Sequence, residues 1–502
     1  MNLRAYSRRE FVSLLGVGAT TLAFRPLRST DATEDILFMS AAKLSGLIRD
    51  KKVSASEAVK AYIARIEAVN PKLNAVVQFC FERALREAAD LDADLARGKV
   101  RGALAGVPMT IKDSIDTEGV ISTGGTVGRM GFVPQKDATV VARLRAAGAI
   151  LLGKTNTPEF TLAGGGIPGV ATTANIIYGV SRNPYDLTRS TSGSSGGAGA
   201  IVAAGGAAFD IGSDWGGSIR GPAHNNGIAG IKPTSGRVPR TGHIVDYGGV
   251  FDSWQQLGPL ARRVEDLVLI MPIISGPDFR DAAILPMPWK DPAQVDVKSL
   301  RVAFYADNTV AETTEETKQT VKRAAELLSE LGAKVTEDFP KDIVLELEEV
   351  RSKLTRGDSW SGLKRLADKW STKAVSPTIT SRLGGEMVTT AEYTELLEKQ
   401  DRTRSKMLSW VKSYDVVLTP VAGKPALPIN FGDNPAALRP GSSYTGIHNT
   451  TGWPAAVIRA GTSPEGFPIG VQVIGQPWGE DKVLAVSQYL ESRTGGWQKP
   501  PI

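Results

Sequence analysis

Two glycine-rich segments that also carry several serines lie close together in the middle of the chain. The first is Ser192-Gly193-Ser194-Ser195-Gly196-Gly197, and the second is Gly212-Ser213-Asp214-Trp215-Gly216-Gly217-Ser218-Ile219-Arg220. A serine hydroxyl becomes a nucleophile when a base removes its proton, and neighbouring glycines let backbone N–H groups converge on a developing negative charge. Either segment alone is compatible with a simple glycine-rich turn. The small residues 198–210 between them predict a helix and a strand that return the chain next to itself, so the pair is a candidate catalytic centre.

A lysine is the candidate base. The short apolar run Gly106–Ile111 predicts a buried strand that ends in Lys112 and Asp113. A lysine accepts a proton near neutral pH only if its pKa of about 10.4 falls, and burial away from a carboxylate lowers that pKa by several units. Neighbours on a strand point to opposite faces, so Asp113 need not pair with Lys112.

Together these segments resemble the amidase signature family of serine hydrolases. Gly193–Gly197 and Gly212–Pro222 match the core of its signature, and Val107–Asp113 matches its lysine motif. The resemblance spans most of residues 40–490. The chain departs from the family pattern at two positions, where it has Ser192 and Trp215.

The resemblance implies a role for each matched residue. Ser218 is the nucleophile, and Ser194, which follows a cis peptide bond, bridges Ser218 to Lys112 in a proton relay. Neutral Lys112 draws the Ser218 proton through Ser194, and the reversed relay protonates the leaving amine. The remaining matched residues support this network or are structural: Ser195, Asp214, Arg220.

The same segment predicts the site that stabilises the oxyanion. Glycines at positions 216 and 217 allow successive backbone N–H groups to point toward one place, where each donor is worth about 3 to 4 kcal/mol of transition-state stabilisation. The expected donors are the N–H groups of four consecutive residues: Trp215, Gly216, Gly217, Ser218.

Two other motif matches point to different chemistry. Gly148–Thr155 fits the phosphate-binding pattern G-x-x-x-x-G-K-[ST], but its variable residues are Ala-Ile-Leu-Leu, which favour the inside of a strand. Gly193–Gly197 fits the G-x-S-x-G elbow, which would make Ser195 the nucleophile with His448 as base. An elbow follows a buried strand, whereas the residues before Gly193 are polar, so the elbow remains a weaker alternative.

The elements around these motifs alternate between strand and helix. We expect helices over residues 54–70, begun by the capping box Ser54–Glu57 and stopped at Asn70-Pro71, over 81–97, and from Asp137 to Ala147. Expected strands cover 149–152, 301–305 and 414–418. The alternation predicts an α/β fold, a large mixed, mainly parallel twisted sheet covered on both faces by helices. No linker or repeat divides the chain, so residues 31–502 are expected to form a single amidase domain.

The first thirty residues have a different composition. Ser7-Arg8-Arg9-Glu10-Phe11 precedes a short apolar stretch to Phe24, which is typical of a twin-arginine signal segment. We therefore predict that residues 1–30 are a signal segment and that the protein is bacterial and periplasmic or secreted. An amphipathic N-terminal helix is the alternative. No other stretch reaches 18 apolar residues, so no stable membrane insertion beyond the leader is expected.

Charge and composition exclude several other functions. The net charge is +6, of which the first thirty residues carry +4, so the body is nearly neutral and offers no basic surface for nucleic acid. Cys80 is the only cysteine, and the three histidines are far apart in sequence. We therefore expect no metal, no disulfide and no cofactor.

The expected function is hydrolysis of carboxylic amides to an acid plus ammonia or an amine, with a small-molecule or peptide amide as substrate. Two alternatives use the same site: an esterase or carbamate hydrolase, and the A-type component of a tRNA-linked glutamine amidotransferase, which works with partner proteins inside the cell. A non-enzymatic binding protein is disfavoured because all three catalytic side chains are present. Residues 120–135 and 341–450 are expected to line the substrate pocket.

Overall fold

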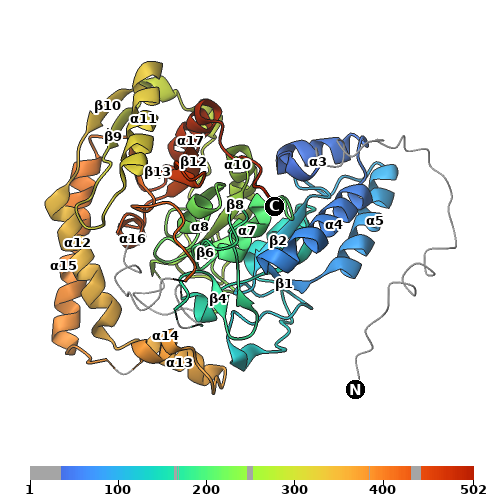
Figure 1. Ribbon diagram of the computed structural model, residues 1–502, viewed down its shortest axis with the longest axis horizontal. Coiled ribbons are helices and arrows are strands. Elements are labelled where there is room, and N and C mark those ends of the chain that lie inside the picture. The colour runs from blue at the N-terminus through green and yellow to red at the C-terminus, as the bar shows by residue number, and fades with distance from the viewer. Residues whose placement is uncertain (1–35, 163–166, 168, 246–252, 384, 431–442) are drawn as a thin grey trace.

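The structure is a computed structural model that describes residues 36–162, 167, 169–245, 253–383, 385–430 and 443–502. The predicted signal segment, residues 1–30, lies outside the described residues. Figure 1 shows a sheet in the middle of the molecule, with the N-terminal helices at one end and the long helices α12 (Lys341–Gly357) and α15 (Thr390–Val411) at the other.

Eleven strands of the described chain form one sheet in the order β1-β3-β2-β6-β8-β7-β12-β13-β11-β9-β10, and β4 and β5 form a separate pair. The strand bounds are β1 Val76–Phe79, β2 Pro108–Lys112, β3 Ile150–Thr155, β4 Ala174–Asn175, β5 Gly179–Val180, β6 Phe209–Asp214, β7 Ala229–Lys232, β8 Gln256–Ala261, β9 Arg301–Phe304, β10 Lys334–Glu337, β11 Val416–Pro420, β12 Ala455–Thr462 and β13 Pro468–Gly475.

The sheet is mixed, as the sequence predicts. Parallel pairing joins β3 to β2 and β2 to β6, and again β11 to β9 and β9 to β10. The strands between these two parallel groups pair antiparallel, from β6 through β8, β7, β12 and β13 to β11. A short turn joins β12 to β13 in a hairpin. The predicted alternation of strands and helices does not include such a hairpin.

Helices flank this sheet (Figure 1). Their bounds are α3 Ala41–Arg49, α4 Ala55–Leu73, α5 Phe81–Ala96, α6 Thr139–Ala146, α7 Gly196–Ala203, α8 Arg220–Asn225, α10 Val264–Ile274, α11 Glu315–Leu331, α12 Lys341–Gly357, α13 Ser361–Lys369, α14 Pro377–Arg382, α15 Thr390–Val411, α16 Gly446–Thr450 and α17 Glu480–Thr494. Short 3-10 helices cover Val127–Arg129, Glu159–Thr161, Pro292–Gln294 and Val297–Ser299.

Strand β13 shows that the helices cover both faces of the sheet. A Cβ at Gly470 would lie 3.2 Å from His224 in α8, and a Cβ at Gly475 would lie 2.6 Å from Val483 in α17. The two glycines are five positions apart, and because side chains alternate along a strand they face opposite sides. Helices α8 and α17 therefore sandwich this part of the sheet, and the glycines let them approach closely.

Several helix boundaries follow the sequence and two do not. Ser54 caps α4 through the expected reciprocal bonds with Glu57. Helix α4 continues past Pro71 to Leu73, because a proline in the last turn keeps helical φ and loses only one N–H bond. Asp137 does not cap α6; its carboxylate instead accepts from the Glu118 N–H and from Arg145, and Ala138 occupies the cap position.

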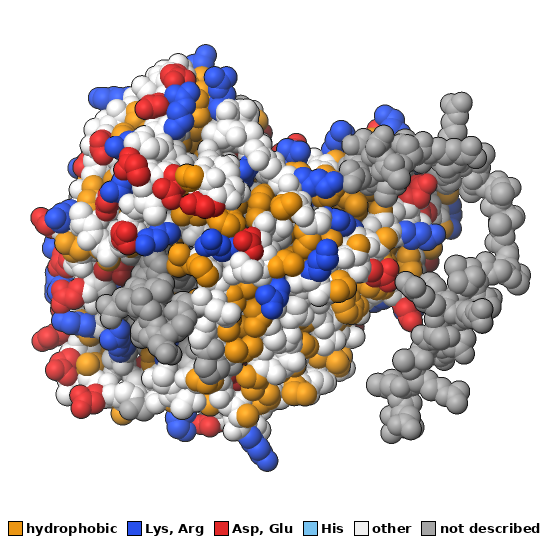
Figure 2. All heavy atoms as spheres, viewed as in Figure 1, with side chains coloured by type: hydrophobic (Ala, Val, Ile, Leu, Met, Phe, Trp, Pro, Cys, Tyr) orange, Lys and Arg blue, Asp and Glu red, His pale blue; other side chains and the backbone are white. Residues whose placement is uncertain are grey.

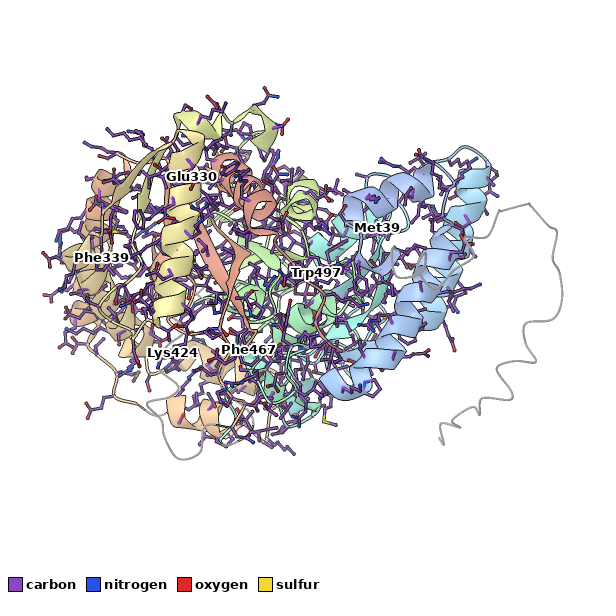
Figure 3. All side chains as sticks on the ribbon, turned by 45° about the horizontal axis from the view of Figure 1, so that its top comes forward. Met39, Glu330, Phe339, Lys424, Phe467 and Trp497 are labelled. Carbon is purple, nitrogen blue, oxygen red and sulfur yellow. The ribbon has the colours of Figure 1, made fainter. Side chains whose placement is uncertain are left out.

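The segment after α17 folds back onto the N-terminal helices. Trp497 stacks on Phe38, with ring centroids 5.4 Å apart, and its indole Nε1 donates to Ala203 O at 3.2 Å. Arg65 in α4 donates to the carbonyl of Ile502 at 3.0 Å. Figure 3 places Trp497 where the N-terminal helices meet the rest of the molecule. The C-terminal segment therefore packs against the N-terminal helices, so both ends of the described chain lie together.

The surface carries charges of both signs. In the view of Figure 2, acidic and basic side chains are interspersed, without a continuous basic area over the described part of that face. Among the described residues no helix is long and apolar enough to cross a membrane.

Candidate active site

The parallel strands β2 and β6 bring the candidate base to the two serine segments. Ile111 pairs with Ile211, so the carboxyl ends of both strands meet at one edge, where Lys112 is the last residue of β2 and Ser213 the next-to-last residue of β6. Lys112 Nζ lies 2.6 Å from Ser194 Oγ, 2.9 Å from Ser213 Oγ and 3.0 Å from Ser195 Oγ. The predicted contact between Lys112 and the first serine segment is thus present.

The environment of Lys112 suits a base. The side chain is fully buried, and no carboxylate oxygen of the described residues lies within 4.0 Å of its amine. Burial lowers the pKa of Lys112 to about 7, and the negative charges of Asp210 and Asp214 oppose that shift only in part. A large fraction of the amine is therefore neutral near pH 7, and Ser194 O–H then donates to Nζ.

Asp113 faces away from this lysine, as alternation along the strand predicts. Its carboxylate accepts from Thr123 N–H and, at 2.5 Å, from Thr123 Oγ1. Burial raises the pKa of Asp113, and Lys154, on the same side, opposes the shift. Asp113 therefore does not form an ion pair with Lys112.

Ser194 and Ser195 use their side chains differently. The peptide bond between Gly193 and Ser194 is cis, as the family resemblance implies. Ser195 occupies the N-cap position of α7 and is fully buried. Its Oγ accepts hydrogen bonds from Lys112 Nζ and from the Ser213 N–H. A buried hydroxyl that is held in this way is poorly placed to attack a substrate, and the described residues just before it form no strand, so the geometry disfavours the G-x-S-x-G elbow.

Ser218 occupies the turn just before α8. Its carbonyl accepts from the Ser195 N–H at 3.1 Å, which places the two serine segments in contact. Unlike Ser194, the Ser218 side chain is only partly buried and can meet a substrate. Its hydroxyl makes no hydrogen bond to Ser194 or to any other described residue, so the predicted contact between Ser218 and Ser194 is not formed in this structure.

Of the four predicted oxyanion donors, the Gly217 N–H already has an acceptor within the turn. It donates to Asp214 Oδ1 at 2.8 Å. The N–H groups of Gly216 and Ser218 make no hydrogen bond to the described residues. Gly217 has a φ of +123°, and a Cβ there would lie 2.4 Å from Thr445 Oγ1, so only glycine fits.

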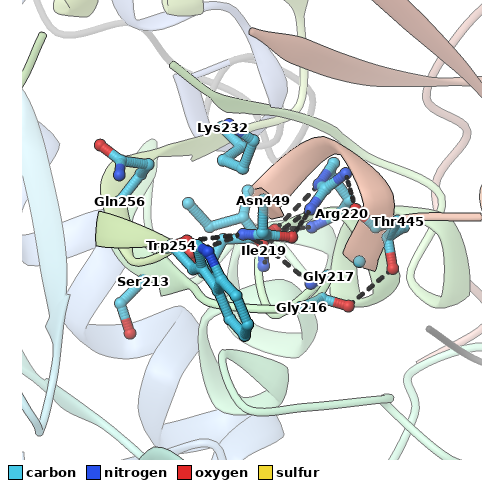
Figure 4. A network of polar contacts seen from close by, with 12 residues as sticks. Ser213, Gly216, Gly217, Ile219, Arg220, Lys232, Trp254, Gln256, Thr445 and Asn449 are labelled. Carbon is cyan, nitrogen blue, oxygen red and sulfur yellow. Dashed lines mark hydrogen bonds and ion pairs between the residues drawn. The ribbon is translucent and has the colours of Figure 1, made fainter. Parts of the chain in front are cut away.

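A buried ion pair holds this turn (Figure 4). Asp214 accepts from Arg220 Nη2 at 2.8 Å and from Arg220 Nε at 3.0 Å, and the Asn449 amide donates to it at 2.9 Å. Burial favours the neutral acid, but the charge and hydrogen bonds of Arg220, with those of Asn449, outweigh it and hold the pKa of Asp214 far below its ordinary value. The supporting role expected for Asp214 and Arg220 matches this geometry.

Three contacts of the site escape motif analysis. Ser213 is a direct partner of Lys112, Asn449 joins Asp214, and Thr445 Oγ1 donates to the Gly216 carbonyl at 2.6 Å. Asn449 lies within residues 40–490, over most of which the chain resembles the family, but none of the three matched motifs includes it. Thr445 also lies outside these motifs, and its partner lies 229 residues away in sequence.

Trp215 lies three residues before the candidate nucleophile Ser218 and packs against two other indoles. Its ring centroid is 5.6 Å from that of Trp254 and 6.2 Å from that of Trp360. The large aromatic residue at this position therefore builds an aromatic wall next to the candidate oxyanion donors.

The residues of the other two motif matches do not form the phosphate-binding loop or the serine–histidine pair that those patterns describe. Lys154, which fits the phosphate-loop pattern, is inside β3 and donates to Ile115 O, Thr117 Oγ1 and Ser122 Oγ. The His448 imidazole makes no hydrogen bond to a described residue, and burial holds its pKa well below the ordinary value. Within the part of the chain that the structure describes, no group of three or more His, Cys, Asp or Glu residues could hold a metal ion.

Comparisons with known proteins agree with this geometry. A family model described as Amidase matches residues 57–484. Among curated proteins, the chain is 34% identical to the A-type component of the glutamyl-tRNA(Gln) amidotransferase of Alkaliphilus metalliredigens, over 90% of this chain and 95% of that protein.

Similar solved structures agree with the family match. The fold is similar to that of 6-aminohexanoate cyclic dimer hydrolase complexed with substrate, with a TM-score of 0.80 and 29% identity, covering 93% of this chain and 99% of that one. It is similarly close to the peptide amidase PAM in complex with the competitive inhibitor chymostatin, with a TM-score of 0.80 and 27% identity, again over 93% and 99% of the two chains.

Proposed function

Because the chain belongs to the amidase family and is an amide-cleaving enzyme of that family, we propose that it acts by itself as a hydrolase of carboxylic amides. The products are a carboxylic acid and ammonia or an amine. Ser218 is the proposed nucleophile, and Lys112 is the proposed base, connected through Ser194.

The contact between Lys112 and Ser194 supports the following reaction. Neutral Lys112 accepts the Ser194 proton as Ser194 accepts that of Ser218, and Ser218 Oγ attacks the amide carbon. The carbonyl oxygen becomes an oxyanion that the N–H groups of Gly216 and Ser218 can bind. The relay then runs backward and protonates the leaving nitrogen, the C–N bond breaks, and an ester to Ser218 remains. Water, deprotonated by the same relay, hydrolyses this ester and restores Ser218.

One observation carries this proposal: a buried lysine amine 2.6 Å from a serine hydroxyl, with no carboxylate of the described residues close enough to keep it charged. Lys154 is also buried without an ion pair to any described residue, but its amine donates to the Ile115 carbonyl as well as to two hydroxyls, whereas all three partners of Lys112 are serine hydroxyls. A neutral amine whose hydrogen-bond partners are all hydroxyls can exchange protons with them, which is what a catalytic base does.

A hydrolysis screen tests the proposal. The panel contains aliphatic amides, aryl amides, C-terminal peptide amides and the ester matched to each, assayed by release of ammonia or amine and of acid. We expect turnover of at least one amide class that disappears in Ser218→Ala. Turnover of esters alone would favour the esterase or carbamate hydrolase, and no turnover of either by the isolated chain would contradict an independent hydrolase.

A second function has support from the curated comparison. The curated relative reported above is the A-type component of a glutamyl-tRNA(Gln) amidotransferase, and 34% identity over nearly the whole chain favours that function. The same site would then release ammonia from an amide for use by a partner protein. Glutamine as the sole hydrolysed substrate, with activity that depends on added partner proteins, would establish this second function instead.

Location separates the two functions. We propose that residues 1–30 direct the folded domain, residues 31–502, to the bacterial periplasm or the medium, supported by the Arg8-Arg9 pair before a short apolar stretch. Fractionation of cells that express the native gene, beside an Arg8→Lys, Arg9→Lys double variant, tests this. Export of the native protein and retention of the variant are expected; equal cytoplasmic retention of both would contradict export.

A further inference from the structure

The guanidinium of an arginine next to the candidate catalytic turn forms no hydrogen bond and no ion pair with any described residue. Arg351, in helix α12, is only 9% exposed. Its guanidinium has five N–H donors, yet it donates no hydrogen bond to any described residue, and its Nε is enclosed without an acceptor. Buried polar groups are almost always hydrogen-bonded, so this guanidinium is prepared for an acceptor that the described chain does not supply.

The guanidinium lies against the candidate oxyanion site. A Cβ at Gly216 would lie 3.0 Å from Arg351 Nη2, and a Cβ at Gly446 would lie 2.7 Å from its Cζ. Any larger residue at 446 would therefore collide with the guanidinium. The chain thus places glycines on two separate segments where this side chain must fit, one of them within the catalytic turn.

Aromatic rings hold the guanidinium in this position. Its Cζ lies 5.2 Å from the centroid of Trp215 and 5.8 Å from that of Trp254. Such contacts orient a guanidinium and attract its charge. An aromatic ring does not, however, accept hydrogen bonds from the N–H groups as an oxygen does. Aromatic contacts therefore explain the orientation of Arg351 and leave its N–H groups available to an oxygen.

The nearby charges do not neutralise Arg351. No carboxylate oxygen of the described residues lies within 4.0 Å of its guanidinium. Glu348, one turn earlier on α12, is the acid whose charge acts on it most, but burial raises the pKa of Glu348 and disfavours its charged form. Asp214 is already paired with Arg220, and the positive charge of Arg220 repels Arg351.

We propose that Arg351 binds a carboxylate of the substrate, so that the preferred substrates are amides that also carry a carboxylate group. This inference rests on the proposed amide hydrolysis and names its substrate class. A planar guanidinium binds a carboxylate through two parallel hydrogen bonds, and the positive charge of Arg351 is balanced when such a substrate enters. Arg351 also lies within residues 341–450, the region that the sequence assigns to the substrate pocket.

Matched substrates test the proposal with the full chain. The probes are monoamides of unbranched dicarboxylic acids of increasing length, each compared with the neutral aliphatic amide of the same length by its kcat/KM. We expect the protein to prefer the carboxylate form at one or more lengths. Arg351→Met should lower kcat/KM for these monoamides by about 10- to 100-fold, the effect of losing a hydrogen bond between charged groups, and should change the value for neutral amides little.

Two further variants make the comparison specific. Arg351→Lys keeps the charge and should restore part of the preference. Arg356→Met removes an arginine of the same helix that is exposed to solvent, and it should leave kcat/KM unchanged for both substrate classes. If Arg351→Met lowers kcat/KM equally for both classes, the residue only positions Trp215 and Gly216, and the proposal is overturned. The absence of any carboxylate preference in the unaltered protein would overturn it too.

A binding measurement separates this inference from the proposed function. In the Ser218→Ala background, calorimetry measures the Kd of the same monoamides without turnover. A Kd that Arg351→Met raises about 10- to 100-fold supports the carboxylate site even if no amide is hydrolysed. If no monoamide binds, the inference fails, whatever the result of the hydrolysis screen.

Discussion

Lys112 is the side chain whose protonation should set the pH dependence of the enzyme. Its amine works as a base only when neutral, and burial lowers its pKa to about 7. Because the protonated form cannot accept the Ser218 proton, kcat/KM should rise with pH through about 7 and level off above it. A pH-rate profile of the unaltered protein measures this limb.

The matched variants for this prediction are Lys112→Ala and His448→Ala. The first removes the base and should lose most of kcat at every pH, whereas the second removes a buried imidazole that makes no hydrogen bond to any described residue. A loss of kcat in His448→Ala as large as that in Lys112→Ala would contradict the lysine relay and reopen the histidine mechanism.

Ser218 is the second residue with a sharp prediction. Ser218→Ala should lower kcat by about a thousandfold or more, because no acyl-enzyme can form and only binding and oxyanion stabilisation remain. The unaltered protein, but not this variant, should gain the mass of one phosphonyl group from a fluorophosphonate probe, as read by mass spectrometry. Labelling that persists in Ser218→Ala and disappears in Ser195→Ala would assign the nucleophile to Ser195.

For single residues, the sequence predicted which motif residues meet at the candidate site, but it did not predict their partners from distant parts of the chain. Lys112, Ser194 and Ser195 meet as the sequence indicates, because short motifs encode them on strand ends and turns. Asn449 reaches Asp214 from 235 residues away, and a contact of that kind depends on the whole fold. The hydrogen bond from the Gly217 N–H to Asp214 could not be predicted either, because the sequence does not show that this carboxylate accepts from its own turn.

At the scale of elements, the turn between β6 and α8 depends on one buried ion pair. Asp214→Asn leaves Arg220 charged, buried and without its partner, which should lower the free energy of unfolding by about 3 to 5 kcal/mol. Denaturant unfolding followed by circular dichroism measures the loss. The depressed pKa of Asp214 means that its stabilisation is present above the unfolded value of 3.8 and is lost as the pH falls below it.

Asp307→Asn is the control for this ion pair. Asp307 pairs with Lys318 at 2.8 Å, but both side chains are 30% or more exposed, so the same substitution should cost less than about 1 kcal/mol. Equal losses in the two variants would mean that burial of the Asp214 pair adds no stability to this turn.

The elements themselves were predictable where the signal is local. The capping box of α4 and the strand before Lys112 formed as expected, since each depends on a few neighbouring residues. The antiparallel centre of the sheet was not predictable from alternation, because β8 inserts between β6 and β7, and β7 pairs with β12 from a distant part of the chain. Pro71 shows a limit of local rules, since a proline in the last turn does not end a helix.

At the scale of the whole molecule, the segment around Trp497 joins the two ends of the described chain. Trp497→Ala removes its stacking on Phe38 and its bond to Ala203, and should cost about 2 kcal/mol because the indole is only partly buried. Hydrogen exchange should then rise in α3 and α4 before it rises in the central strands. Unchanged exchange in these helices would contradict a stabilising role of the segment.

The same packing imposes an order in time on a newly made chain. Trp497 is synthesised more than 400 residues after Phe38, which at 5 to 20 residues per second is a delay of about 20 to 90 s. During that interval the first helices leave the ribosome with the surface that Trp497 later covers still open to water and to chaperones. The N-terminal layer, although made first, is therefore among the last parts of the protein to be finished.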